Sequence, residues 1–169
     1  MTLRFALLRP PALPAGPYPS ELPENEEDYD HYFCLIACTS VELGDTGYRF
    51  VAGGFGPSEW AVDTYDLSTL VEELPELLQA LRRGAEWSVD MYAPGLERTL
   101  RFRPRGTTVW VSCESRTSWR PNPPDELIGH AALEDMLTTL ATDYGRALKD
   151  IGSGFAELEP FPSWRSGRV

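Results

Sequence analysis

The residues with the most obvious capacity for chemistry in this sequence are three cysteines and two histidines. Cys34 and Cys38 lie four positions apart in the apolar run "YFCLIAC", and both thiols with one histidine, His31 or His130, could form a zinc site. Zinc ligands usually occur at tighter paired spacings, with chain reversals that let them converge. The spacing therefore favours reduced, metal-free thiols buried on one face of a strand, and we expect a buried thiol at Cys113 as well.

A hydrolytic site would need a nucleophilic serine or cysteine, a base, and an acid that orients the base. The sequence has no G-x-S-x-G motif, and the "GSG" at 152–154 follows a predicted helix where a strand would be required. His31 beside Asp28 or Asp30 could act as a base, but a chain with 26 acids is expected to place one near a histidine by chance. Carboxylate pairs are equally numerous, and no pair stands out. We therefore predict no catalytic residue, no cofactor and no metal.

The most concentrated charge lies in the stretch "ENEEDYD", residues 24–30. With Glu21 it makes six acids, without a lysine or arginine between positions 21 and 30. Residues 1–80 hold 14 acids and three arginines, whereas residues 81–169 hold 12 acids and 12 bases, so the first half carries the whole net charge of −11. Such a field repels nucleic acid and attracts a basic protein. We predict partner contacts at Glu24, Glu26, Glu27, Asp28 and Asp30. The alternative is a solvated linker.

A second predicted contact lies in the loop "SRTSWRPNPPDE", residues 115–126. Trp119 and Arg120 stand side by side ahead of three prolines, and both residue types are enriched among the residues that dominate binding energy at interfaces. The alternative is a tryptophan that folds back over the edge of a sheet with Arg120 stacked on it.

The pattern of apolar residues predicts one α+β domain. A proline-rich and acidic arm (1–30), in which "LRFALL" could add a strand, precedes the domain at 31–150, and an irregular tail (151–169) packs on or near it. The run 32–40 is predicted as a central strand, and two further β segments follow at 47–55 and 59–66. A helix at 66–83 should be kinked or divided at Pro75. The strongest prediction is an antiparallel meander of strands at 86–92, 96–103 and 107–115, followed by a helix at 130–148.

No apolar run reaches the length of about 20 residues that a membrane helix needs, and the first residues are a poor secretory signal. We therefore expect a cytoplasmic protein that does not bind membranes. The polar face of the meander leaves one further possibility. Arg98, Arg101 and Arg103 could converge with Asp90 and Glu97 into a clamp for a carboxylate or phosphate, although a solvated cross-strand ladder is the commoner arrangement.

The segments "WAVDTYDLSTLVEELPELLQALRRG" and "WSVDMYAPGLERTLRFRPRGTTVWVSCESRTSW" resemble a group of small actinobacterial proteins over about residues 59–119. Some of these proteins are similar to immunity proteins of bacterial polymorphic toxin systems. The resemblance implies an acidic cytoplasmic α+β protein that binds and neutralises a toxin domain, and it supplies no catalytic residues. The leading hypothesis is therefore an immunity-type inhibitor of a basic toxin or nuclease. The alternatives are an enzyme or anion binder that uses the polar face of the meander, and a regulatory or structural domain without a dedicated ligand.

Overall fold

A computed structural model of the chain describes residues 2–21 and 31–169. The elements in chain order are β1 (Arg4–Leu8), α1 (His31–Asp45), β2 (Arg49–Gly53), α2 (Thr64–Val71), α3 (Leu74–Arg82), β3 (Trp87–Met91), β4 (Arg98–Arg105), β5 (Thr108–Ser115), β6 (Asp125–Gly129), α4 (His130–Asp150) and α5 (Phe161–Arg165). The acidic run lies outside the described residues, and so do the contacts predicted at Glu24, Glu26, Glu27, Asp28 and Asp30.

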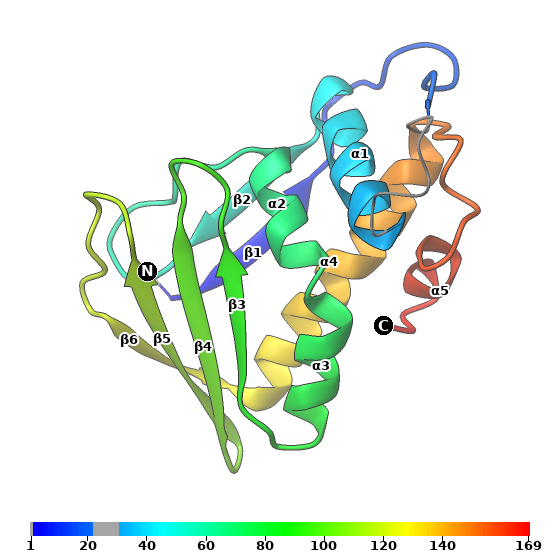
Figure 1. Cartoon of the computed structure of the whole chain (residues 1–169). Coiled ribbons are helices and arrows are strands. Elements are labelled where there is room, and N and C mark those ends of the chain that lie inside the picture. Colours follow the sequence, from blue (N-terminus) through cyan, green and yellow to red (C-terminus); the bar gives the residue numbers. More distant parts are fainter. Residues whose placement is uncertain (1, 22–30) are drawn as a thin grey trace.

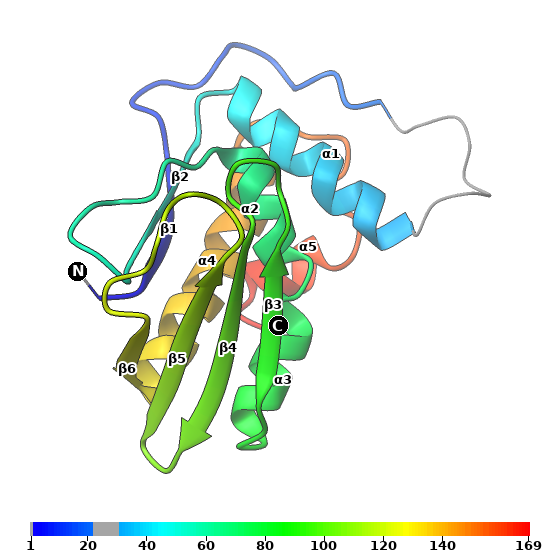
Figure 2. The same cartoon turned by 60° about the vertical axis from the view of Figure 1, so that its left-hand side comes forward.

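These elements form one α+β domain, as predicted (Figure 1). The larger sheet has the strand order β3-β4-β5-β6, and the smaller sheet joins β1 to β2. Helices α3 and α4 lie on one face of the larger sheet, and its other face is open to solvent (Figures 1 and 2). Helix α1 packs against α2 and α4, and α5 packs against α4. None of the helices in the described residues is both long enough and apolar enough to cross a membrane.

The predicted meander is confirmed, since β3, β4 and β5 are consecutive antiparallel neighbours. The alternation of side chains places Val89, Leu100, Val111 and Cys113 on the buried face, where they pack with the helices. A fourth strand, β6, pairs with β5 and was missed. Its five residues directly follow three prolines, so the sequence pattern is that of a loop.

The strand predicted at 32–40 is wrong, because these residues form the first part of helix α1. A continuous apolar run has no period of its own and fits a buried strand as well as a helix. The side chains of Leu35, Ile36, Thr39 and Ser40 are buried, which is the spacing of one helical face. The two hydroxyls in this set are satisfied by α4, because they lie 2.7 and 2.8 Å from the hydroxyl oxygen of Tyr144.

The strand predicted at 59–66 is also wrong: it is reduced to one isolated bridge, between Gly53 and Glu59. The segment then turns into α2, whose start is fixed by a reciprocal cap in which the side chains of Asp63 and Asp66 each accept a backbone N–H of the other. Division of the following helix at Pro75 is confirmed. The proline occupies the first turn of α3, where its missing N–H costs nothing.

The two sheets are joined by one half-buried carboxylate on β6. Glu126 accepts the backbone N–H of Leu3, next to β1, and the N–H of Phe55, which follows β2, each at 2.5 Å. Between them Gly54 has a φ of +120°, and a Cβ at that position would lie 2.8 Å from the Cα of Leu3. A side chain there would force Gly54 away from Leu3, its neighbour across the smaller sheet.

Both ends of the chain contribute to the core. β1 pairs with β2 along its whole length, as the sequence of the arm allowed. The tail, expected to be irregular, contains α5, in which Phe161 and Trp164 are fully buried against Tyr144 of α4.

Candidate protein-binding surface

The solvent-facing side of α1 carries no charge between Tyr32 and Val41, and its first exposed charge is Asp45, the last residue of the helix. Helices at a protein surface normally carry charged side chains on that side. Here no charged residue occurs between His31 and Glu42, and Glu42 is itself buried. The side that faces solvent has Phe33 and Val41 at 40% and 46% exposure, with Cys34, Ala37 and Cys38 partly exposed between them.

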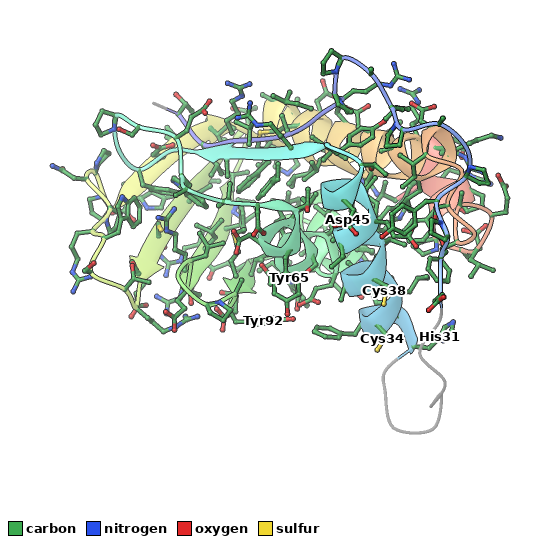
Figure 3. The ribbon with its side chains drawn as sticks, turned by 90° about the horizontal axis from the view of Figure 1, so that it is seen from above. His31, Cys34, Cys38, Asp45, Tyr65 and Tyr92 are labelled. Atoms are coloured by element: carbon green, nitrogen blue, oxygen red, sulfur yellow. The ribbon has the colours of Figure 1, made fainter. Side chains whose placement is uncertain are left out.

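Two tyrosines from other elements extend this surface. Figure 3 shows Tyr65 of α2 and Tyr92, which follows β3, on the same side of the molecule as Cys34 and Cys38. The rings of Phe33 and Tyr92 stack with their centroids 6.3 Å apart and an interplanar angle of 18°. We call the set of Phe33, Cys34, Ala37, Cys38, Val41, Tyr65 and Tyr92 the α1 face.

The hydroxyl of Tyr92 is held by an acid at the edge of the α1 face. It donates to the carboxylate of Glu72 at 3.3 Å. Burial, together with the charge of Glu72 and this hydrogen bond, raises the pKa of Tyr92, so the phenol stays neutral and remains a donor. A stacked and hydrogen-bonded aromatic pair loses little side-chain entropy when a partner covers it.

The surroundings of the α1 face are strongly acidic. Residues 50–81 contain six acids and no lysine or arginine. Burial is the main cause that raises the pKa of Tyr32, and the carboxylates of Glu76, Glu72 and Glu73 raise it further, which shows that these acids lie close to the start of α1. Among the described residues, Glu76 and Glu73 form no salt bridge. An uncharged centre with an acidic rim is the result.

The proline-rich arm fixes the point from which the acidic run begins. The N–H of Tyr18 donates to the carbonyl of Ile151 at 3.0 Å, and its hydroxyl donates to Asp45 at 2.7 Å, which raises the pKa of Tyr18 to about 12. Two residues on, the hydroxyl of Ser20 accepts the N–H of Gly154. Figure 2 shows this segment running along the same edge of the molecule as α1. Since residue 30 directly precedes α1, the acidic run joins the chain at the end of the α1 face that carries Phe33.

The predicted contact at Trp119 and Arg120 lies elsewhere, on the β5–β6 loop at the far end of the sheet from α1 (Figure 1). Trp119 is half-buried and packs edge-on against Trp60, with ring centroids 6.2 Å apart. The arginine that stacks on both rings is Arg98, whose guanidinium carbon lies 3.7 Å from the centroid of Trp119 and 4.2 Å from that of Trp60. Arg120 donates instead to the backbone carbonyls of Thr117 and Trp119. Trp119 therefore folds back over the sheet, as the alternative interpretation predicted, but the arginine that stacks on it is Arg98 and not Arg120.

The arginines of the meander do not converge into a clamp. Arg98 points into the core and is only 6% exposed. On the open face, Arg101 pairs with Glu114 at 3.0 Å and Arg103 with Glu86 at 3.6 Å. A third pair joins Arg116 to Asp90, at 2.5 Å. This face is a solvated cross-strand ladder of neutralised charges, which gives an anion little net attraction.

The cysteines and histidines are dispersed in the same way. Within residues 2–21 and 31–169, no three side chains of His, Cys, Asp or Glu are grouped closely enough to hold a metal. Cys113 is buried, as predicted, and burial raises its pKa to about 11. Cys34 and Cys38 are partly exposed on a helix, so their predicted burial in a strand is wrong. His130 donates from Nε2 to the carbonyl of Leu81, which joins the start of α4 to the end of α3.

Comparisons of the chain with protein-family models, with curated proteins and with solved structures give no match. Function is therefore inferred from the geometry of the α1 face, which the sequence interpretation missed because it treated residues 32–40 as a strand covered on both faces. The available signal was the absence of any charge over residues 32–41, in a segment bordered by acids on its N-terminal side.

Proposed function

We propose that this protein is a protein-binding module that holds a basic partner on its α1 face, and most specifically an immunity-type inhibitor that occludes a basic toxin or nuclease domain. The observation that carries the proposal is the uncharged, aromatic side of α1 inside an acidic rim. Interfaces between proteins have this composition, with aromatic and apolar residues at the centre and charge at the edge.

The acidic rim and the acidic run would act at long range. A basic partner is attracted over the Debye length of about 8 Å at physiological salt, which increases the association rate. At contact, Phe33, Val41 and Tyr92 would fill apolar hollows of the partner, and burial of these side chains would slow dissociation. If the partner is a nuclease, the acids would compete with nucleic acid for its cationic cleft. Inhibition by such occlusion requires no catalytic group.

The experiment is site-specific photo-cross-linking in lysate of the native host. A photo-reactive amino acid replaces Val41 in one version of the protein and Trp110, which is 41% exposed on the open sheet face, in a matched control. The proposal predicts that the probe at 41 captures a basic protein that the probe at 110 does not capture. The purified partner should then lose activity when mixed with the wild-type chain. Capture of the basic protein from 110 alone, or capture of only acidic proteins from 41, would contradict the proposal.

A further inference from the structure

The outer edge of β6 has no partner strand. In the pairing of β5 with β6, the N–H of Cys113 donates to the carbonyl of Pro124, and the N–H of His130 donates to the carbonyl of Thr107. Antiparallel pairing alternates from residue to residue, so the backbone groups at 126 and 128 point towards β5, and those at 125, 127 and 129 point away. No hydrogen bond among the described residues reaches the N–H groups at these three positions. Figure 1 shows β6 as the outermost strand.

Exposed apolar side chains accompany this edge. Leu127 is 56% exposed, the largest exposure of any large apolar side chain in the described residues. Directly opposite it on β5 is Trp110, also exposed, in a pair without hydrogen bonds, where side chains approach most closely. The register continues the row to Arg103 on β4, which pairs with Glu86. The row therefore becomes more apolar towards the free edge.

We propose that β6 pairs in antiparallel fashion with β6 of a second copy of this chain, on a two-fold axis through Leu127. In this register Leu127 lies directly opposite Leu127 of the second copy, and within each copy Trp110 flanks Leu127 on β5. Asp125 lies opposite Gly129, and Glu126 lies opposite Ile128. The two four-stranded sheets become one sheet of eight strands, and the outward backbone groups of both edges are satisfied.

Charge excludes two of the neighbouring registers. An axis through Asp125 or through Glu126 would place two identical carboxylates directly opposite each other, which is destabilising. An axis through Gly129 would bring the first residues of α4 into collision with those of the second copy. Glu126 points inward, a device that often protects free edges, but here its carboxylate is already bonded to Leu3 and Phe55.

The dimer is weak, and salt strengthens it. A five-residue edge with one apolar row buries less than the 1,200–2,000 Å² or so of a stable interface. Each copy also carries a net charge of −11, so the copies repel each other until salt screens them. For a basic partner the effect of salt is the opposite, because screening weakens its attraction to the acidic chain. Since β6 and α1 lie at opposite ends of the molecule (Figure 1), the dimer leaves the α1 face free, and the inference stands independently of the proposed function.

Two substitutions test the pairing. Gly129 has φ −61° and ψ 134°, which proline adopts without strain, and a Cβ there makes only an ordinary contact with Ala132 at 3.8 Å. Gly129→Pro therefore removes an outward N–H and leaves the pairing with β5 intact. Leu127→Lys places a charge on the axis. Leu158→Lys is the matched control, since Leu158 is 40% exposed and lies in the segment before α5, away from β6.

Sedimentation velocity from micromolar to millimolar protein, at low and high salt, gives the result. We expect the wild type and Leu158→Lys to shift towards the dimer mass as concentration and salt rise. Gly129→Pro and Leu127→Lys should each raise the dimer dissociation constant by at least about tenfold. Amide exchange on the wild type is an independent readout, in which the N–H groups at 125, 127 and 129 gain protection with concentration. A wild type that stays monomeric throughout, or a dimer that both variants leave unchanged, overturns the proposal.

Discussion

Arg98 provides a quantitative test of how the end of the larger sheet is held together. Arg98 is 6% exposed, and its guanidinium contacts the rings of Trp60 and Trp119. Desolvated cation–π contacts contribute roughly 1–2 kcal/mol each. Against this gain, Nε and Nη1 are buried without a hydrogen bond to any described residue, and an unsatisfied buried donor costs about 1–3 kcal/mol. Burial also lowers the pKa of Arg98, which marks the cost of keeping the charge there. The two contributions nearly cancel.

We therefore expect Arg98→Met, which keeps a long apolar stem between the two tryptophans, to change the free energy of unfolding by no more than about 1 kcal/mol. Arg98→Ala leaves a cavity between the rings and should cost about 2–4 kcal/mol. Urea denaturation followed by tryptophan fluorescence measures both values, with Arg101→Met on the exposed face as a control expected to change little. A loss of more than about 3 kcal/mol for Arg98→Met would show that the charge itself stabilises the stack, and the reasoning would be refuted.

Three further predictions concern the joint between the sheets, the thiols and the acidic run. Glu126→Gln should lower the free energy of unfolding by about 2–3 kcal/mol, because two backbone N–H groups lose a charged acceptor; thermal and urea unfolding measure this, and a neutral result would contradict it. Cys34 should react with a thiol reagent in the native protein, whereas Cys113 should react only after unfolding. The free energy of unfolding should also fall between pH 9 and about 11, because the thiol of Cys113 ionises in the unfolded chain at a lower pH than in the folded one. Replacing Glu26, Glu27, Asp28 and Asp30 by the corresponding amides should slow association with a basic partner several-fold at low salt and less at high salt, and should leave stability nearly unchanged. Stopped-flow kinetics measure the association rate, and an unchanged rate at low salt would disprove the prediction.

The parts of the fold that could be predicted are those in which one period dominates. The meander alternates strictly, and α4 has a continuous helical stripe that includes Leu133, Leu137, Leu140 and Leu148, so both were found with nearly correct bounds. Division at Pro75 followed from the missing N–H of proline.

Two of the failures share a physical cause: they fall where the local sequence pattern fits more than one structure, and tertiary contacts decide between them. Helix α1 is apolar on nearly every side, and its helical state is fixed by Thr39 and Ser40 reaching Tyr144, more than 100 residues away. Strand β6 pairs with β5 over its whole length, and Glu126 joins it to the smaller sheet, contacts that no local signal encodes. The start of α2 was within reach, because Asp63 and Asp66 have the spacing of a reciprocal cap.

The same cause explains the candidate site. Charge could be located from the sequence, and it pointed to the acidic half of the chain. The absence of charge over residues 32–41 was also visible in the sequence, but it becomes an exposed surface only because α1 is a helix and Tyr92 stacks on Phe33.

The central claim is that the α1 face is the binding surface, and the most direct measurement is the dissociation constant of the captured partner for Phe33→Ala combined with Val41→Ser. Both side chains are exposed, so the double variant should fold like the wild type, as circular dichroism can verify. We predict that affinity falls at least tenfold, mainly through faster dissociation, because the centre of an interface carries most of its binding energy. The control, Trp110→Ala on the open sheet face, should bind like the wild type. Unchanged affinity of the double variant, or an equal loss in the control, would contradict the claim.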